Sequence, residues 1–317
     1  MRFIFDFIII LILLLCAYWM YVIIRSFFIK KNKKIKTKLW RIIIVIVLIL
    51  IFGSVFYGSF IEPQLIKVKK TSVNLNKTPE TETIKIAFIT DLHVGPYKQE
   101  NYVEKIVKKT LAEKPDLILL GGDFLYNEEQ EAQYLTPIKQ LAENFPVFAV
   151  TGNHEFNTGK YDDENLIDRT KLLRQLFTDW EIQILDTQMV PLTLQNKKID
   201  LYGVEDLWTE RADLKKLIDY VTPNRPNILL SHNPDIILDP LHAQFDLIIS
   251  GHTHAGQIRL PYIGSIPGVP TQLGRKYDHG LFKFDNNYLY ISAGLGESGV
   301  RARFFDPPEL SIINLDL

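Results

Sequence analysis

The chain has 317 residues, of which 47% are hydrophobic and 23% are charged, so a disordered or collagen-like protein is excluded. Its single cysteine, Cys16, excludes a disulfide framework and any zinc or iron–sulfur site built on several cysteines. The net charge of −1 conceals a split: residues 1–70 carry 12 Lys/Arg against 2 Asp/Glu, whereas residues 71–317 carry 24 against 35. Because the larger part is acidic and would repel an anionic polymer, nucleic acid is not an expected partner.

Two uncharged apolar runs occupy the first sixty residues. Phe7–Ile24 has 18 residues and Ile42–Ile61 has 20, and a helix of either length crosses a hydrocarbon core of roughly 30 Å. A signal peptide is the alternative, but no small-residue cleavage site follows the first run and a second run comes after it. We therefore expect residues 1–62 to form a two-helix transmembrane hairpin in the lipid bilayer.

The segment between the two runs, residues 25–41, sets the expected orientation of this hairpin. It holds eight Lys/Arg and no acidic residue, and the positive-inside rule assigns such a loop to the cytoplasmic side. Lys67, Lys69 and Lys70 favour the opposite orientation, but with fewer charges. We expect an integral protein of the cell membrane whose second domain, residues 63–317, is extracytoplasmic.

From Glu62 onward, short apolar runs alternate with segments of helical spacing, which predicts an α/β domain with largely buried sheets. The expected strands are Leu65–Leu75 at a sheet edge and then Ile84–Thr90, Leu117–Leu120, Val147–Thr151, Ile199–Val204, Ile228–Ser231 and Leu247–Ser250, with a linker at Asn76–Thr83. The expected helices are Asn101–Lys114, Ala132–Asn144, Leu166–Thr178 and Ala212–Val221. The late runs suggest a second sheet with antiparallel pairs, formed by Leu281–Asp285, Tyr288–Ser292 and Leu310–Leu315.

Five of the expected strands are followed directly by side chains that can bind metal ions. These segments are Asp91-Leu-His93, Gly121-Gly122-Asp123, Gly152-Asn153-His154-Glu155, His232-Asn233-Pro234 and Gly251-His252-Thr253-His254. Each segment alone is also typical of an ordinary polar turn. In open α/β sheets, however, ligands bind at the carboxyl ends of the strands. Five of the seven histidines fall in these segments, so together they predict one metal centre.

Asp, His and Asn side chains suit Zn²⁺, Mn²⁺ or Fe rather than soft-metal chemistry. Seven ligands exceed the needs of one tetrahedral ion, so we expect two divalent ions with Asp123, in the middle of the set, as the bridge. Two ions roughly 3.5–4 Å apart clamp an in-line displacement at phosphorus and lower the pKa of bound water toward about 7. They also neutralise the phosphate oxygens. The sequence thus predicts a hydrolase in which metal-bound hydroxide attacks a phosphate ester.

These five motifs resemble those of the calcineurin-like metallophosphoesterases, written D-x-H, G-D, G-N-H-E/D, a lone H and G-H-x-H. The resemblance spans residues 84–315 and implies an α/β fold: a four-layer αββα sandwich of two mixed sheets, with a dinuclear site at the sheet edge. It implies one ion held by Asp91, His93, Asp123 and His254 and another held by Asp123, Asn153, His232 and His252. It also implies catalytic roles for Asp123 and for His154, which would contact the scissile phosphate as general acid or electrostatic stabiliser.

Three further segments are similar to a bacterial membrane-anchored phosphodiesterase branch of this superfamily: Gly256–Pro261, Gly294–Gly296 and Arg303–Glu309. Many relatives carry a proline just before the arginine of the third segment, where this chain has Val300-Arg301-Ala302. Some members act on lipid-linked substrates, including a UDP-diacylglucosamine pyrophosphohydrolase.

Two features of this region have alternative interpretations. Arg303 is a candidate substrate-binding residue because a guanidinium pairs with phosphate through two hydrogen bonds; the alternative is a salt bridge to Asp306 or Glu309. Apolar residues within 262–272 form either a lip for an acyl chain beside the metals or an ordinary packed loop.

The sequence therefore favours a metallophosphoesterase that cleaves a phosphodiester or pyrophosphate bond in a membrane lipid or a lipid-linked envelope precursor. A site tethered close to the bilayer meets lipids at high effective concentration. The same chemistry on soluble nucleotides or phosphomonoesters is the first alternative. A non-catalytic membrane-anchored scaffold is the second, although no metal-ligand position of the motifs is substituted.

Overall fold

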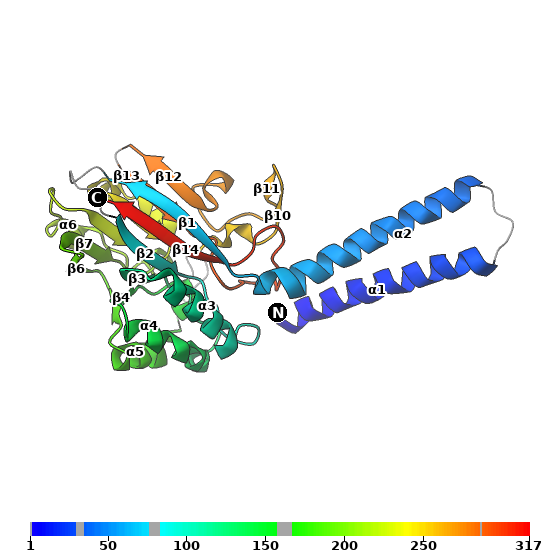
Figure 1. Ribbon diagram of the computed structural model, residues 1–317, viewed down its shortest axis with the longest axis horizontal. Coiled ribbons are helices and arrows are strands. Elements are labelled where there is room, and N and C mark those ends of the chain that lie inside the picture. The colour runs from blue at the N-terminus through cyan, green and yellow to red at the C-terminus, as the bar shows by residue number, and fades with distance from the viewer. Residues whose placement is uncertain (1, 30–34, 76–82, 157–166, 286) are drawn as a thin grey trace.

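The computed structural model describes residues 2–29, 35–75, 83–156, 167–285 and 287–317. It consists of a pair of long helices and a globular α/β body (Figure 1). Residues 30–34 of the basic loop and residues 76–82 of the expected linker lie outside the described residues.

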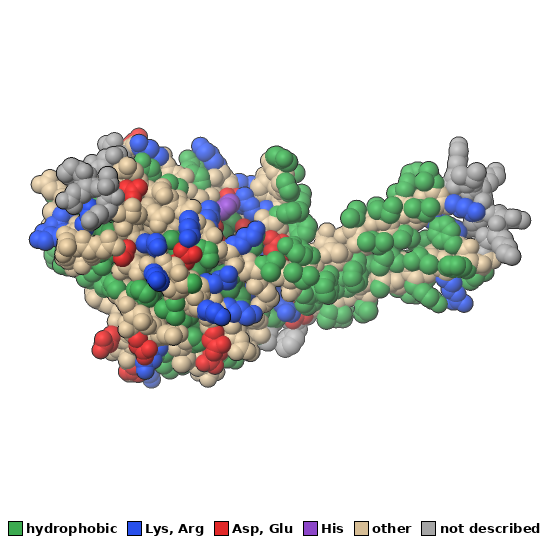
Figure 2. Space-filling view, in the orientation of Figure 1, with side chains coloured by type: hydrophobic (Ala, Val, Ile, Leu, Met, Phe, Trp, Pro, Cys, Tyr) green, Lys and Arg blue, Asp and Glu red, His purple; other side chains and the backbone are tan. Residues whose placement is uncertain are grey.

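The helical pair is formed by α1 (Arg2–Ile29) and α2 (Ile35–Phe56), which lie side by side (Figure 1). Ile4–Ile29 and Thr37–Gln64 are long and apolar enough to cross a membrane, and only 11% and 0% of their most apolar windows are buried. The pair therefore does not serve as core helices of the body. Apolar side chains cover its outer surface (Figure 2).

The body contains two six-stranded mixed sheets, as expected. The first has the order β1-β14-β2-β3-β4-β5 and the second the order β12-β13-β9-β8-β7-β6. The strands of the first sheet are β1 (Lys67–Asn74), β2 (Thr83–Ile89), β3 (Leu117–Leu120), β4 (Val147–Ala149), β5 (Gln183–Ile184) and β14 (Glu309–Asp316). Those of the second are β6 (Gln188–Leu194), β7 (Lys197–Gly203), β8 (Asn227–Leu230), β9 (Leu247–Ser250), β12 (Gly280–Phe284) and β13 (Asn287–Ile291). β10 (Arg259–Leu260) and β11 (Gly264–Ser265) form a separate hairpin.

Two expectations about the strands require correction. β14 does not join β12 and β13 in the second sheet but lies between β1 and β2 in the first, antiparallel to β2 and parallel to β1. Its pairing joins residues more than two hundred positions apart, which no local pattern specifies. β6 was not anticipated because Pro191 interrupts its sequence, and it lies at a sheet edge, where a proline is tolerated.

Two of the four expected helices form close to their expected bounds, as α3 (Glu100–Glu113) and α5 (Thr170–Asp179). The other two shorten. The segment Glu129–Ile138 is a 3₁₀ helix that contains Pro137 and passes into α4 (Lys139–Ala142), because proline has no amide hydrogen for an α-helical bond.

Of the expected helix Ala212–Val221, only α6 (Lys215–Ile218) forms. Two 3₁₀ segments, Pro234–Leu238 and Pro240–Gln244, complete the cover of the second sheet. The fourth layer of the expected sandwich is therefore thin and consists largely of short turns.

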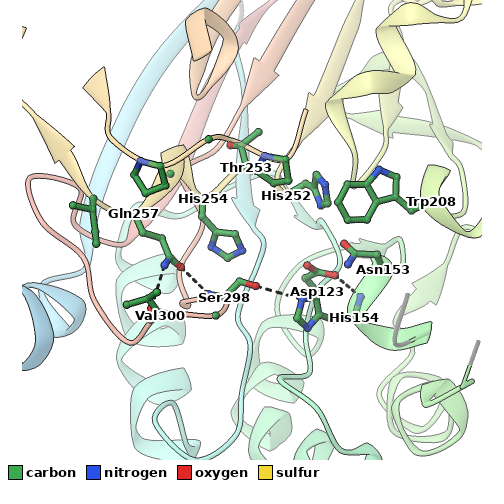
Figure 3. A pocket seen from close by; sticks show the side chains of 16 residues that line it. Asp123, Asn153, His154, Trp208, His252, Thr253, His254, Gln257, Ser298 and Val300 are labelled. Carbon is green, nitrogen blue, oxygen red and sulfur yellow. Dashed lines mark hydrogen bonds between the residues drawn. The ribbon is translucent and has the colours of Figure 1, made fainter. Parts of the chain in front are cut away.

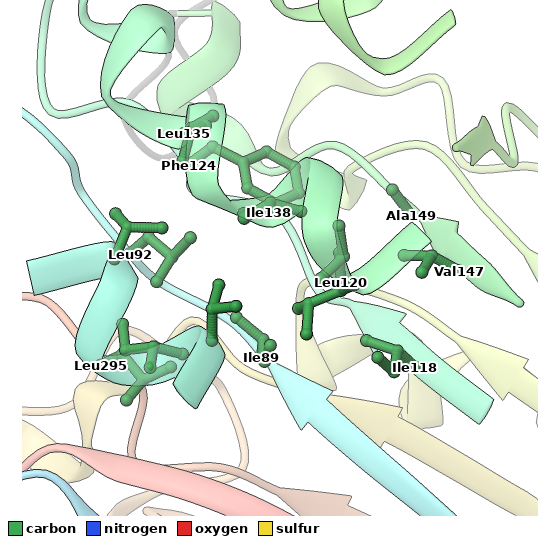
Figure 4. Packing of buried hydrophobic residues seen from close by; sticks show 14 of the residues in the cluster. Ile89, Leu92, Ile118, Leu120, Phe124, Leu135, Ile138, Val147, Ala149 and Leu295 are labelled. Atoms are coloured by element: carbon green, nitrogen blue, oxygen red, sulfur yellow. The ribbon is translucent and has the colours of Figure 1, made fainter. Parts of the chain in front are cut away.

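Side chains of the two sheets alternate between three apolar clusters. On β2, Ile86 and Phe88 join the cluster between the sheets, whereas Ala87 and Ile89 pack on the face covered by α3, α4 and α5. Figure 4 shows Ile89 together with side chains of β3, β4 and the helical layer. Because both faces of the central strands are buried, they read as continuous apolar runs in the sequence.

Hydrogen bonds join the helical pair to the body. The backbone N–H of Arg303 donates to the carbonyl of Gly58 (2.8 Å). The buried Glu62 carboxylate accepts the N–H groups of Phe305 (3.0 Å) and Asp306 (2.6 Å). The segment that follows α2 is therefore hydrogen-bonded to the body.

The side chain of Arg303 lies inside the body and has no exposed surface. Its guanidinium donates to the carbonyls of Ala293 (2.9 Å) and Gly296 (2.7 Å) and pairs with the Asp306 carboxylate (3.0 Å). The salt bridge to Asp306, the alternative interpretation, is confirmed. The hypothesis that Arg303 binds substrate is not supported, because its guanidinium is fully buried and has no surface that a substrate could reach.

Replacing Arg303 with methionine tests this structural assignment. We expect the R303M variant to lose about 3–5 kcal/mol of unfolding free energy, because the buried Asp306 carboxylate and two carbonyls lose their donor. Thermal unfolding followed by circular dichroism measures this loss. The control is Arg275→Met at an exposed position, which should change stability by less than about 0.5 kcal/mol. A raised KM with unchanged stability would restore the substrate-binding hypothesis.

Candidate metal centre

The metal-binding motifs gather at the carboxyl ends of adjacent parallel strands from both sheets. In the first sheet β2, β3 and β4 run parallel, and Asp91, Asp123 and Asn153 follow their ends. In the second sheet β8 and β9 run parallel and deliver His232 and His252. All of these side chains are buried. The sheet-edge placement expected from the sequence therefore brings residues from five separate loops together.

The side chains form two groups that share Asp123. The first is Asp91, His93, Asp123 and His254, and the second is Asp123, His232 and His252; within each group the potential ligand atoms lie within 4.8 Å of one another. Asp123 Oδ2 lies 3.2 Å from His232 Nε2 and 3.5 Å from His93 Nε2. This division matches the ligand sets that the family resemblance implied.

Asn153 lies in the same site. It is buried and lines the pocket next to Asp123 and His154 (Figure 3). That Asn153 completes the second group stays a prediction.

Backbone carbonyls fix the orientation of two of the imidazoles. His232 Nδ1 donates to the carbonyl of Gly121 (2.8 Å), and His93 Nδ1 donates to that of Leu125 (3.3 Å). The Nε2 atoms of both rings thereby face Asp123, where each can bind a metal ion once it carries no proton. Such hydrogen bonds are the usual means of presenting a histidine nitrogen to a metal ion.

Burial and neighbouring charges set the protonation of the site. Burial, with the nearby imidazoles adding to it, lowers the pKa of His93 and of His252 to about 3, so both rings are neutral at physiological pH, as metal ligation requires. Burial alone would raise the pKa of Asp123, but the charge of His232 outweighs it and holds that pKa well below its ordinary value. Burial likewise would lower the pKa of His232, but the charge of Asp123 outweighs it and raises that pKa well above its ordinary value, so His232 carries a proton that a bound cation would displace. Burial raises the pKa of Asp91 to about 6, a shift that an adjacent cation would reverse.

The donor set fits two cations. His93 Nε2 lies 3.0 Å from His254 Nε2, and His232 Nε2 lies 3.1 Å from His252 Nδ1. Lone-pair nitrogens and carboxylates that converge in a buried site repel one another unless a positive charge lies between them. The chemistry of these oxygen and nitrogen donors suits the borderline divalent metals expected from the sequence.

The loops that carry the ligands adopt strained backbone conformations. Asp91, His93, Asp123, His252 and His254 all have φ between 43° and 71°, a region that non-glycine residues rarely occupy. At Gly251 a Cβ atom would overlap the Asp91 carboxylate, which explains why glycine precedes His252. Strain of this kind persists where the surroundings hold the chain in place and is concentrated at functional sites.

Glu155 holds two of these loops together, a role that sequence reasoning missed. It is fully buried, and its Oε2 accepts the N–H groups of Gly152 (2.8 Å) and Asp123 (3.0 Å). Its Oε1 accepts those of Phe124 (2.8 Å) and Leu125 (3.1 Å). The sequence signal for this role was the acid at the fourth position of the Gly-Asn-His-Glu motif. Because Glu155 is not among the implied metal ligands, a structural role was the remaining interpretation.

A cavity of about 290 Å³ opens over the metal-binding side chains. His154 lines it, with Nδ1 bonded to the carbonyl of Tyr126 (3.1 Å) and Nε2 toward the hydroxyl of Ser298 (3.4 Å). Figure 3 shows Asp123, Asn153 and His154 on one side of this cavity and His252, Thr253 and Trp208 on the other. Another part of the cavity wall is apolar and includes Ile258, Pro267 and Pro270.

The role of Glu155 predicts that its replacement by glutamine weakens metal binding. In Glu155→Gln the new NH₂ group faces backbone N–H donors, so the loops carrying Asp123 and Asn153 should separate. We expect metal content after loading with Mn²⁺ and dialysis to fall at least severalfold, measured by elemental analysis. Glu143→Gln, at an exposed position, is the control and should retain its metal. Equal metal content in the two variants would contradict the assignment.

Comparison with known proteins identifies the family. Residues 84–256 match the calcineurin-like phosphoesterase family. A Helicobacter pylori protein (strain 26695) described as an uncharacterized metallophosphoesterase is 32% identical, over 83% of this chain and 67% of that protein. Phosphodiesterase YaeI of Escherichia coli is 29% identical, covering 82% of this chain and 92% of YaeI. The UDP-2,3-diacylglucosamine pyrophosphatase LpxG of Chlamydia muridarum is 26% identical, covering 81% and 91%.

The family match, the relatives and the buried Asp/His site agree with one another. The chain belongs to the calcineurin-like phosphoesterases and is a metallophosphoesterase hydrolase.

Proposed function

We propose that this metallophosphoesterase cleaves a phosphodiester or pyrophosphate bond in a membrane lipid or a lipid-linked envelope precursor. The observation that carries the chemistry is the pair of buried ligand groups sharing Asp123 beneath an open cavity. Asp91, His93, Asp123 and His254 would hold one divalent ion, and Asp123, Asn153, His232 and His252 the other. When bound, such ions activate water and neutralise charge on the phosphate oxygens.

His154 is the residue of this chain best placed to act on the substrate. Because its Nδ1 is bonded to the Tyr126 carbonyl, Nε2 is the nitrogen that faces the cavity. A phosphate in the cavity would meet this atom, which donates a proton or a hydrogen bond to a phosphate or leaving-group oxygen when both nitrogens of the ring are protonated. The backbone N–H of His154 donates to Asp123 Oδ1 (2.9 Å), which keeps the residue next to the metal-binding carboxylate.

Two observations favour a lipid or lipid-linked substrate over a soluble nucleotide. The helical pair is apolar and joined directly to the body, so it would hold the cavity near a bilayer and raise the effective concentration of lipids there. The partly apolar cavity wall suits a substrate that carries hydrocarbon. The relative LpxG is named for a lipid-linked pyrophosphate substrate, and this chain resembles it over most of its length.

The chemistry is tested on the full chain in detergent with Mn²⁺ and two soluble probes, bis(p-nitrophenyl) phosphate and p-nitrophenyl phosphate. We expect the diester to be hydrolysed faster than the monoester. Asp123→Asn should reduce the rate by at least a thousandfold and the metal content by more than one ion per chain, because both groups use this carboxylate. Asp213→Asn, at a half-exposed carboxylate far along the chain, is the control. Metal-loaded protein that hydrolyses neither probe would count against an enzyme.

We also propose that the helical pair spans the membrane with residues 63–317 on the extracytoplasmic side. The basic loop between the helices favours this orientation by the positive-inside rule. Fusions of alkaline phosphatase and of green fluorescent protein after Leu317 test it: the first should be active and the second dark. The opposite pattern would place the catalytic body in the cytoplasm.

A further inference from the structure

The β10–β11 hairpin exposes the most prominent apolar side chains of the body. Tyr262 and Ile263 at its tip are 109% and 67% exposed, and Ile266 and Leu260 beside the tip are 44% and 38% exposed. We call residues 259–266 the finger. Contiguous exposed apolar groups of this kind are uncommon on a water-facing surface and mark a contact with another apolar surface.

Hydrogen bonds and an ion pair hold the base of the finger, so the exposed tip has a defined position on the body. Arg259 donates from Nη1 to the Ala255 carbonyl (2.7 Å) and pairs with the Asp278 carboxylate. The Ile266 N–H donates to the carbonyl of Ile258 (2.9 Å), and the two short strands pair in antiparallel register. A hairpin fixed in this way presents the same side chains to any surface that it meets.

The finger lies on the side of the body from which the helical pair extends, with its tip directed across the long axis of the pair (Figure 1). Figure 1 shows β10 and β11 beside the body-proximal end of α2, and Figure 2 shows the apolar surface of the pair continuing toward the finger. Contacts bridge the two. The Arg259 N–H donates to the Phe304 carbonyl (2.8 Å), and the Phe304 ring lies 6.4 Å from that of Tyr57, which follows α2.

Exposed apolar side chains complete this border between finger and helices. Phe60, Ile61 and Phe305 are 37%, 41% and 57% exposed around the point where α2 joins the body. Tyr57, which is 37% exposed, lies at the same border, and tyrosine is enriched at the boundary between a bilayer and water. If the helical pair lies in a bilayer, the surface of that bilayer would therefore contact the finger as well as the border where α2 joins the body.

We propose that the finger inserts into the membrane interface and is a second contact of the catalytic body with the bilayer, in addition to the helical pair. The occupant of this surface is lipid. The inference rests on the proposed membrane anchoring, because the finger reaches a bilayer only where the helices hold the body against one.

This contact has a consequence for substrate access. Ile258, Pro267, Gly268 and Pro270 flank the finger in sequence and line the cavity over the metal-binding residues. The cavity mouth therefore adjoins the membrane contact. A phosphate headgroup can reach His154 while its acyl chains stay in the bilayer, so the finger would favour membrane-embedded over soluble substrates at the same catalytic centre.

Site-specific fluorescence tests insertion without using activity. In full-length Cys16→Ser protein, Tyr262→Cys is labelled with the fluorophore NBD and reconstituted into vesicles of phosphatidylethanolamine and phosphatidylglycerol. We expect blue-shifted emission, quenching by nitroxide-labelled lipid and protection from aqueous iodide. The matched control is Tyr220→Cys, which is 57% exposed and follows α6 at the opposite end of the body (Figure 1). Its label should be quenched by iodide and not by lipid.

Two outcomes would overturn the proposal. Equal iodide quenching at positions 262 and 220 would show a finger in water. Protection from iodide without quenching by lipid would show that protein, such as a second copy of this chain, covers the finger.

Substrate preference provides a second readout. Tyr262→Ser should lower the ratio of hydrolysis of a vesicle-embedded phospholipid to hydrolysis of bis(p-nitrophenyl) phosphate at least fivefold, whereas Tyr220→Ser should leave the ratio unchanged. An unchanged ratio in Tyr262→Ser would contradict the role in access. If the wild-type chain hydrolyses neither probe, the proposed function fails, and the fluorescence result still decides whether the finger inserts.

Discussion

The crowding of buried lone pairs at one sheet edge is the constraint on which the rest of this structure depends. Two carboxylates, four imidazoles and an amide share one site of buried side chains. Such groups repel one another, and the cost of burying them is offset when cations occupy the space between them. The strained left-handed conformations of the ligand residues and the close approach at Gly251 are local costs of the same arrangement. Tightly held loops are needed to maintain it.

Buried charged side chains hold those loops. Glu155 ties the loop of Asp123 to that of Asn153 through four backbone N–H groups. Arg303 ties the carbonyls of the Ala293–Gly296 loop, and the N–H of Gly296 in turn donates to the carbonyl of Asp91 (2.5 Å). The backbone of Arg303 is bonded to Gly58, at the end of the second long helix. A short chain of hydrogen bonds therefore connects the end of the helical pair to a metal-binding loop, so the proposed anchor and the metal centre are parts of one structure.

The finger extends this relation between anchoring and chemistry. The finger, which presents Tyr262 to the surroundings, begins five residues after His254 of the Gly251–His254 motif, and the chain then returns to line the cavity. Substrate selection by such an enzyme would depend on which phosphates the bilayer brings to the cavity mouth as well as on contacts inside it. The apolar part of the wall formed by Ile258 and Pro267 suits a substrate whose phosphate lies in the cavity and whose hydrocarbon lies next to that wall.

The sequence by itself determined the features that rest on local pattern. The apolar runs gave two long helices, continuous apolar segments gave the buried parallel strands, and motifs placed after those strands gave the metal-binding residues, because parallel strands bring their carboxyl ends to one edge. Tertiary structure alone decided the features that depend on contacts between distant residues. The insertion of β14 between β1 and β2, the shortening of the helices around Pro137 and α6, the four hydrogen bonds of Glu155 and the enclosure of Arg303 belong to this class. An arginine that binds phosphate and one that binds carbonyls look alike in sequence, since only burial determines which partners it meets.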